Sequence, residues 1–149
     1  MTHSVSIIPP SVLNVVQEDA MRLLKPATDR SDGRHDVSTV WADVEDCRFT
    51  LWMAFDPKNK PVGALVTTFE AYPLRNMLNI LFCGGSELED WHEDMLDVLE
   101  EYAKEHNCDG IELVGRPGWK KFLQHHGWEA TQLVVERMFE IEEEQKEVA

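Results

Sequence analysis

Residues 76–128 read NMLNILFCGGSELEDWHEDMLDVLEEYAKEHNCDGIELVGRPGWKKFLQHHGW, and this stretch decides the fold. The apolar run over 76–83 predicts a strand that stops at Gly84-Gly85, and helically spaced apolar residues predict a helix over 87–107. A second strand follows over 110–114, so the unit is a parallel strand–helix–strand crossover. A small-molecule site is therefore expected where the two strands end, with the two glycines facing a groove between them.

The chain before this stretch predicts two helices. The first ends at Lys25-Pro26, because the residue before a proline avoids the helical region. The second covers 37–44 and is capped by Asp36 or Ser38. The polar loop 27–36 between them is a candidate for a mobile segment over a site.

Alternating apolar residues predict the strands of a mixed sheet, in which the middle three form an antiparallel meander. The expected strands are 5–9, 48–56, 62–72, 76–83, 110–114 and 131–141. The fold class is therefore α/β (α+β), with a sheet of six or seven strands and helices on both faces. One domain is expected over 1–149, with the charged residues 142–149 as a frayed tail.

Composition indicates a compact cytoplasmic protein. Hydrophobic residues make up 43% of the 149 residues, and no run approaches the roughly 20 apolar residues that span a membrane. The start MTHSVSIIPP lacks a basic region, so no signal peptide is expected. Three cysteines without a CxxC spacing predict neither a disulfide framework nor a zinc cluster, and each is expected to be partly buried.

Acidic residues dominate the charge of the chain. The formal net charge is −14, and eight acids but no Lys or Arg lie between Ser86 and Ala103. Nucleic acid and anionic lipid are therefore not expected as ligands, whereas a protein partner with a basic surface or, less readily, DNA mimicry fits the charge. Ser86 is the expected N-cap of the acidic helix.

The element order resembles that of the GNAT superfamily of acyl-CoA-dependent N-acyltransferases over nearly the whole chain. The stretch GRPGWKKFLQHHGW, 115–128, is similar to the family pattern N-x-x-A-x-x-F-Y-x-x-x-G-F and places Phe122 on its first aromatic residue. The chain also resembles small, divergent GNAT-like proteins of tailed phages, which implies the host cytoplasm or the virion as its location. The resemblance implies an acetyl-CoA-dependent N-acetyltransferase or, alternatively, an inactive GNAT-fold protein in virion assembly or host interaction.

Where that family binds the CoA diphosphate, this chain reads CGGSELEDW, 83–91. The family motif is Q/R-x-x-G-x-G/A, whose backbone N–H groups hold the diphosphate. Here two glycines are kept, but the basic residue is missing and three acids follow. Arg116 could compensate, while Leu123 replaces the family's proton-donating Tyr. The resemblance assigns acetyl-CoA binding to Leu81, Phe82, Cys83, Gly84, Gly85, Ser86, Arg116 and Phe122.

Two carboxylates on strands are candidates for the base that takes a proton from an attacking amine. Glu70 lies on the third expected strand and Glu112 on the fifth, and a positioned water is the alternative. Our interpretation places Glu70 and Asn79 in the catalytic site, with Asn79 as a hydrogen-bonding group for the acceptor. No metal is expected, because alternate residues of the helical pattern DWHED (90–94) point in different directions.

Overall fold

The computed structural model describes residues 2–140, and contacts divide it into two compact units, Met1–Val114 and Gly115–Ala149. The larger unit holds one sheet with the strand order β1-β2-β3-β4-β5. Its strands are β1 Ser4–Ile7, β2 Thr50–Phe55, β3 Pro61–Ala71, β4 Asn76–Gly85 and β5 Gly110–Leu113. Its helices are the 3-10 turn η1 Pro10–Val12, α1 Leu13–Asp29, α2 Val37–Glu45 and α3 Leu88–Glu105. The smaller unit holds α4 Pro117–Leu123 and the 3-10 turn η2 Gln124–His126.

Strand pairing follows the expected meander and crossover. Strands β1 to β4 pair antiparallel in sequence order, and β4 pairs with β5 in parallel across α3. The α/β fold class, the antiparallel meander and the parallel crossover are therefore confirmed. Among the described residues there are five strands in the sheet, so the expected number of six or seven was too high.

The last predicted strand is wrong within the described residues. Residues 131–140 form neither helix nor strand, and the side chains of Leu133, Val135 and Phe139 are 90%, 89% and 75% exposed. An alternating sequence becomes a strand only where a neighbouring strand supplies hydrogen-bond partners, and no described strand pairs with this segment. Ile141 and the expected frayed tail 142–149 lie outside the described residues.

Helix α1 continues past the proline that was expected to end it. Pro26 lies inside α1, which runs to Asp29. The side chains of Leu24 and Thr28 are fully buried, so the last turn is held against the sheet. In addition, Thr28 Oγ1 donates to the carbonyl of Lys25 (3.0 Å), and Lys25 Nζ pairs with Asp29 Oδ2 (2.7 Å). Burial and local bonds together offset the cost of an internal proline, which is about 3 kcal/mol.

Helix α2 begins with a capping box. Asp36 Oδ1 accepts a hydrogen bond from the Thr39 N–H (2.8 Å), and Thr39 Oγ1 accepts one from the Asp36 N–H (3.3 Å). The bonds from the Thr39 backbone and hydroxyl lower the pKa of the Asp36 carboxyl, because they stabilise its ionised form. Of the two residues expected to cap this helix, Asp36 is confirmed.

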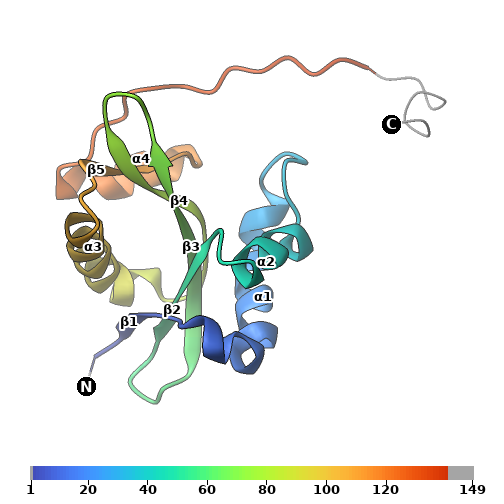
Figure 1. Cartoon of the computed structure of the whole chain (residues 1–149), viewed down its shortest axis with the longest axis vertical. Coiled ribbons are helices and arrows are strands. Elements are labelled where there is room, and N and C mark those ends of the chain that lie inside the picture. Colours follow the sequence, from blue (N-terminus) through green and yellow to red (C-terminus); the bar gives the residue numbers. More distant parts are fainter. Residues whose placement is uncertain (1, 141–149) are drawn as a thin grey trace. The chain divides into compact units, whose positions relative to one another are not determined.

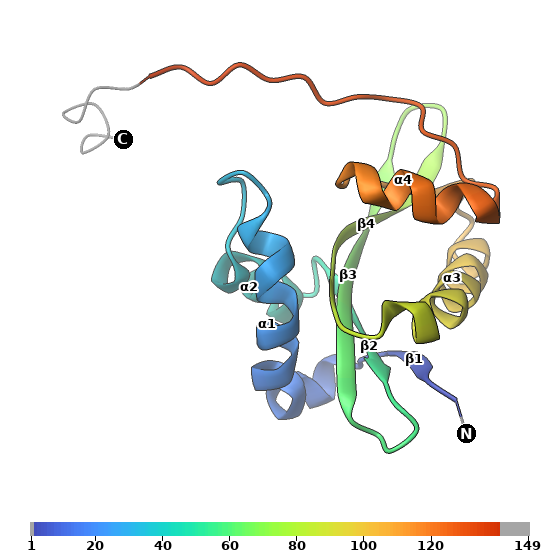
Figure 2. The same cartoon turned by 180° about the vertical axis from the view of Figure 1, so that it is seen from behind.

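The sheet of the larger unit carries helices on both faces (Figure 1, Figure 2). Helix α1 packs on β3 and β4 with α2 beside it, and α3 packs on the opposite face against β1, β4 and β5. On the α3 side, the buried ring of Trp91 covers Gly63, where an added Cβ would lie 2.4 Å from the ring. Helix α3 also contacts the first strand, since Asp94 Oδ2 accepts from the Val5 N–H at 2.7 Å. The core beneath α1 and α2 comprises Ile8, Leu13, Ala20, Leu23, Leu24, Val40, Trp41, Val44, Leu51, Met53, Ala64 and Val66.

Candidate functional site

Strands β4 and β5 pair over a short distance and then separate. Their parallel register begins at Met77 and Gly110 and ends at Ile80 and Leu113. Strand β4 nevertheless continues alongside β3 as far as Gly85. Past Ile80, no described strand pairs with the β5-facing edge of β4, so that edge presents backbone groups without a sheet partner. We call this place, Ile80–Gly85 of β4 beyond the end of β5, the fork.

A bulge interrupts β4 at the fork. Val66 of β3 pairs with Phe82 and Thr67 pairs with Ile80, which leaves Leu81 as the extra residue. A bulge leaves one residue outside the ladder and increases the twist of the strand. The end of β5 and the bulge thus both interrupt the backbone pairing of β4 at the same point.

Three side chains meet beside the fork: Tyr72, which directly follows β3, Asn79 of β4 and Glu112 of β5. Glu112 Oε1 accepts hydrogen bonds from the Tyr72 hydroxyl (2.6 Å) and from Asn79 Nδ2 (3.0 Å). The bond to Glu112 raises the pKa of Tyr72, and burial and the negative charges of Glu112 and Glu70 raise it further. The phenol therefore keeps its proton at neutral pH and orients the carboxylate of Glu112. We call Tyr72, Asn79 and Glu112 the polar cluster.

The polar cluster lies on the face of the sheet that α1 covers. Ala64 and Thr68 of β3 are four positions apart and so point to the same side, where Ala64 belongs to the core beneath α1. Asn79 pairs with Thr68, and Glu112 pairs with Asn79, which puts both side chains on this face. Glu70, two positions from Thr68, shares the face, but no described residue donates a hydrogen bond to its carboxylate.

The loop between α1 and α2 reaches β4 at the fork. The rings of His35 and Phe82 pack edge to face, with centroids 5.2 Å apart. Sequence reasoning singled out this loop as a cover for a site but named neither His35 nor Tyr72. The spacing of two residues between Glu70 and Tyr72 was a usable signal for the tyrosine, because it places both on one side of a strand. The sequence carries no comparable signal for His35.

The two glycines that end β4 have packing roles. A Cβ on Gly84 would lie 2.3 Å from the carbonyl oxygen of Leu23 in α1. A Cβ on Gly85, where φ is +133°, would lie 2.3 Å from the carbonyl oxygen of Val62 in β3. The space into which a side chain would extend from either glycine is therefore filled, by α1 at Gly84 and by β3 at Gly85. That their backbone faces a groove stays a prediction.

The turn into α3 also differs from the expected one. Glu87, in the left-handed region at φ 59°, occupies the N-cap position, and no side chain caps the helix. Ser86 is therefore not the N-cap. Its N–H donates to the carbonyl of Val62 (2.8 Å) and its own carbonyl accepts from Trp91 Nε1 (2.8 Å), so both backbone groups tie the turn to neighbouring elements.

The start of α3 does not fit the diphosphate of CoA. Two of the N–H groups at this helix start already have partners in the protein: that of Ser86 donates to the carbonyl of Val62, and that of Asp90 donates to the carbonyl of Glu87 (2.8 Å). The first turn contains Glu89 and Asp90 and no basic residue. Two like unit charges 4 Å apart repel by about 4 kcal/mol near a protein surface, which outweighs the favourable helix dipole of at most about 1 kcal/mol at an exposed site.

The remaining predicted cofactor residues divide between the two units. Leu81, Phe82 and Cys83 lie at the fork, and burial raises the pKa of the Cys83 thiol to about 12, so it stays protonated. Arg116 is the N-cap of α4 and Phe122 packs edge to face with Trp119 inside the smaller unit, 6.0 Å between centroids. Their part in a site shared with the fork stays a prediction.

The predicted burial of the cysteines holds for two of the three. Cys83 and Cys108 are half-buried, whereas Cys47 is exposed because it follows the C-terminal end of α2 in a turn.

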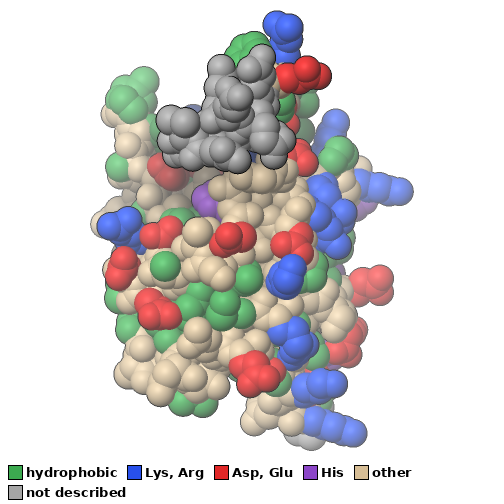
Figure 3. Space-filling model, turned by 90° about the vertical axis from the view of Figure 1, so that its right-hand side faces the viewer, with side chains coloured by type: hydrophobic (Ala, Val, Ile, Leu, Met, Phe, Trp, Pro, Cys, Tyr) green, Lys and Arg blue, Asp and Glu red, His purple; other side chains and the backbone are tan. Residues whose placement is uncertain are grey.

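Charge is distributed unevenly over the larger unit. On its α1/α2 side, basic and acidic side chains are interspersed with apolar ones (Figure 3). The outer face of α3 is acidic instead, with Glu93, Asp97 and Glu101 all exposed, and Lys104 there pairs with Glu100 at 3.0 Å. No helix within residues 2–140 has both the length and the apolar character needed to cross a membrane.

Known structures share this fold at low sequence identity. Glucosamine-6-phosphate N-acetyltransferase from Arabidopsis thaliana matches 94% of this chain and 100% of its own, with a TM-score of 0.64 and 11% identity. A GNAT family acetyltransferase from Staphylococcus aureus matches 93% of this chain and 100% of its own, with a TM-score of 0.61 and 14% identity. A transcriptional regulator from Bacillus halodurans matches 92% of this chain and 99% of its own, with a TM-score of 0.66 and 19% identity. No family model and no curated protein sequence matches the chain.

Proposed function

We propose that this GNAT-fold chain transfers an acyl group from a thioester of the acetyl-CoA type to an amine. The observation that carries the proposal is the fork: the pairing of β4 and β5 ends at Ile80 and Leu113, directly after the residue pair that holds Asn79 and Glu112. An open strand edge beside an oriented carboxylate offers a binding surface for the donor and a base for the acceptor. The fold neighbours that are acetyltransferases support the same reaction class.

Glu112 is the residue best placed to act as the base. An amine that is protonated at neutral pH must lose a proton before its nitrogen can attack the thioester carbonyl. Glu112 is held by hydrogen bonds from Tyr72 and Asn79, whereas Glu70 has no such support from the described residues. In this reading Glu112 accepts the proton, Asn79 and Tyr72 orient its carboxylate, and Glu70 attracts the ammonium form of the acceptor.

The donor fits the fork in part. Acetyl-CoA supplies the activated acyl group, and the backbone of Leu81–Cys83, which has no strand partner on the β5 side, can hydrogen-bond the amides of its pantetheine arm. The start of α3 does not offer a binding site for the diphosphate. Two of its N–H groups are hydrogen-bonded within the protein, and the side chains of its first turn include Glu89 and Asp90. Binding energy must therefore come mainly from the arm, and we expect weaker binding than a complete diphosphate site would give.

Titration of the full chain with acetyl-CoA, CoA and pantetheine tests the donor. With the free ligand at ten times its dissociation constant, folding stability should increase by about 1.4 kcal/mol, which thermal denaturation resolves. We expect pantetheine and CoA to bind with affinities within about tenfold of each other, since a missing diphosphate contact is worth little here. A failure of all three compounds to bind at millimolar concentration would refute the proposed donor.

Substitution of the base tests the chemistry. In an assay that follows thiol release from acetyl-CoA with a panel of primary amines, Glu112→Gln should lower the rate by about 10²–10⁴-fold. Glu101→Gln, an exposed acid of α3, is the matched control and should leave the rate unchanged. Equal activity in the two variants would remove Glu112 from the mechanism, and Glu70→Gln would then identify the other candidate.

The acidic outer face of α3 favours a second function, the binding of a protein with a basic surface. The exposed residues Glu93, Asp97 and Glu101 form one side of the helix, and nothing in the proposed transfer reaction uses them. The intact chain should retain such a partner at physiological salt and release it at high salt. The triple variant Glu93→Gln, Asp97→Asn and Glu101→Gln should fail to bind it even at physiological salt. Roles in virion assembly or host interaction, and DNA mimicry, are the more specific forms of this hypothesis.

A further inference from the structure

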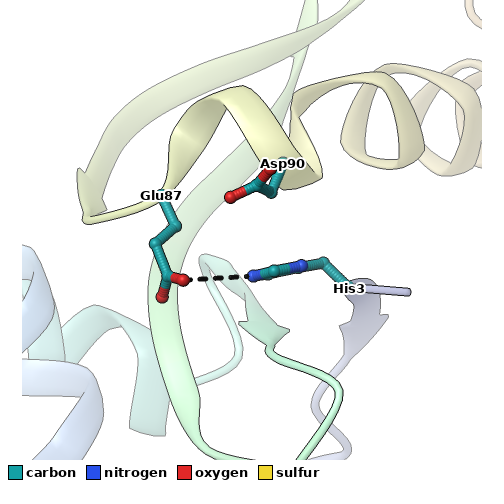
Figure 4. Close-up of side chains that lie close together, drawn as sticks. All are labelled: His3, Glu87 and Asp90. Atoms are coloured by element: carbon teal, nitrogen blue, oxygen red, sulfur yellow. Dashed lines mark ion pairs between the residues drawn. The ribbon is translucent and has the colours of Figure 1, made fainter. Parts of the chain in front are cut away.

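Three side chains with metal-ligand chemistry converge between the first strand and the start of α3. His3 precedes β1, while Glu87 and Asp90 lie at the N-terminal end of α3 (Figure 4). One ligand atom from each of the three lies within 4.8 Å of the others. Glu87 is the N-cap of α3 and Asp90 lies in its first turn, and their carboxylates face the same space as His3.

The separation of the ligand atoms suits a small cation. His3 Nε2 and Glu87 Oε1 are 3.5 Å apart. In a tetrahedral zinc site with bonds of about 2.0–2.2 Å, two ligand atoms are separated by about 3.4 Å. A metal ion could therefore bind both atoms without a change in backbone position, and a rotation of the Asp90 side chain would complete three protein ligands.

The imidazole of His3 is directed at Glu87 without forming a hydrogen bond. Its Nε2 atom is buried, makes no hydrogen bond within the described residues and faces Glu87 Oε1 as an ion pair at 3.5 Å, and its side chain is 13% exposed. An ion pair with a carboxylate requires a protonated imidazole, whereas a metal ion between the two atoms would be bound by the neutral imidazole and the carboxylate together. Asp94 follows Asp90 by one helical turn, but its carboxylate accepts a hydrogen bond from the Val5 N–H and is not counted among the ligands.

We propose that His3, Glu87 and Asp90 bind one divalent transition-metal ion, with Zn²⁺ as the best fit. An imidazole with two carboxylates suits zinc, whereas Mg²⁺ and Ca²⁺ prefer sites made of oxygen ligands alone. Three protein ligands leave a fourth position for water. The ion joins β1 to α3 and neutralises the acidic end of that helix, a property that the proposed acyl transfer neither requires nor implies.

No sequence pattern indicates this site, because His3 lies more than 80 positions before the two acids. The expectation of no metal rests on the pattern DWHED (90–94), whose histidine is His92, and leaves His3 out. In the structure His92 Nδ1 instead lies 3.2 Å from the carbonyl oxygen of Leu88 and 3.1 Å from that of Glu89. Asp90 contributes to the cluster, but with a partner from the first strand rather than from its own helix.

Metal titration of the full chain without an added histidine tag tests the proposal. After treatment with a chelator and its removal, calorimetry with Zn²⁺ should show one equivalent bound, and excess Mg²⁺ should not displace it. His3→Ala and Glu87→Gln should each weaken binding at least tenfold. His125→Ala and Glu89→Gln, which change an exposed histidine and the acid beside the cluster, are matched controls and should bind as the parent chain does.

Cobalt substitution gives a second readout. The visible absorption of bound Co²⁺ reports a site with few ligands, and the spectrum should disappear in Glu87→Gln, a variant whose folding is checked by circular dichroism without metal. The proposal is overturned if the parent chain binds no Zn²⁺ or Co²⁺. It is equally overturned if His3→Ala and Glu87→Gln bind the ion as tightly as the two controls.

Discussion

Replacing Gly84 by Ala should destabilise the protein by a packing clash between β4 and α1. The added Cβ would lie 2.3 Å from the carbonyl oxygen of Leu23, whereas ordinary contact begins at 3.4 Å. The neighbour is backbone of a helix whose Leu24 is fully buried, so it cannot rotate away as a flexible side chain would. Helix and strand must separate by about 1 Å, and overpacking of this kind costs about 1–3 kcal/mol.

Thermal denaturation and urea denaturation measure this cost. For a chain of this length, each kcal/mol lowers the melting temperature by about 2–4 °C, so Gly84→Ala should melt about 2–12 °C below the parent chain. Gly118→Ala is the matched control, because a Cβ at Gly118 meets nothing within 4 Å. That variant should be as stable as the parent chain or slightly more stable, since Ala is the better helix former.

The outcome distinguishes two explanations for the glycine. If Gly84 serves only to admit a ligand, Gly84→Ala would weaken donor binding while leaving the melting temperature unchanged. Such a result would refute the packing argument. A fall in melting temperature of the same size in Gly118→Ala would refute it as well, because the effect would then not depend on the contact with Leu23.

Three further predictions follow from contacts in the larger unit. Leu99 is fully buried, so Leu99→Ala should lower the unfolding free energy by about 2–5 kcal/mol in urea denaturation, whereas Leu74→Ala, at a position 97% exposed, should change it by less than about 0.5 kcal/mol. The pKa of Asp36 is lowered from 3.8 in the folded state, so its contribution to stability is present above that pH and is lost as pH falls through the folded pKa. The stability difference between the parent chain and Asp36→Ala should accordingly shrink below pH 3.8, and a constant difference would contradict the cap. Glu112→Gln should shift the pKa of Tyr72 back toward 10.0, visible as an earlier phenolate step in ultraviolet titration, while Glu101→Gln should leave that step in place.

Most of the architecture could be predicted because it depends on local patterns. Alternating and helical periods located β2, β3, β4, β5, α2 and α3, and residue type narrowed the cap of α2 to Asp36 or Ser38, of which Asp36 is the one observed. The two largest errors came from tertiary context. Pro26 predicts the end of a helix, but buried neighbours keep α1 intact. The alternating residues 131–140 predict a strand, but no partner strand is present among the described residues.

The candidate site could be predicted only in outline. Sequence patterns predict a site at the ends of the fourth and fifth strands. They also make Asn79 a predicted site residue and Glu112 a candidate base. They could not show that Tyr72 donates to Glu112, because that bond depends on how three strands are registered. The bulge at Leu81 was equally hidden, since a one-residue mismatch between strands leaves no mark on apolar alternation. The packing role of Gly84 depends on the position of α1, and that of Gly85 on the close approach of β3.

The hydrogen bond between Asp94 and Val5 has a consequence for how this protein behaves at high concentration. Strand β1 is the outermost strand of the sheet, so its free side is a template on which a second molecule could add its own strand. The Asp94 carboxylate occupies a donor on that side and places a negative charge there. At Val5 an incoming strand would therefore meet a negative charge in place of a free N–H, which disfavours the addition of a second molecule at this edge.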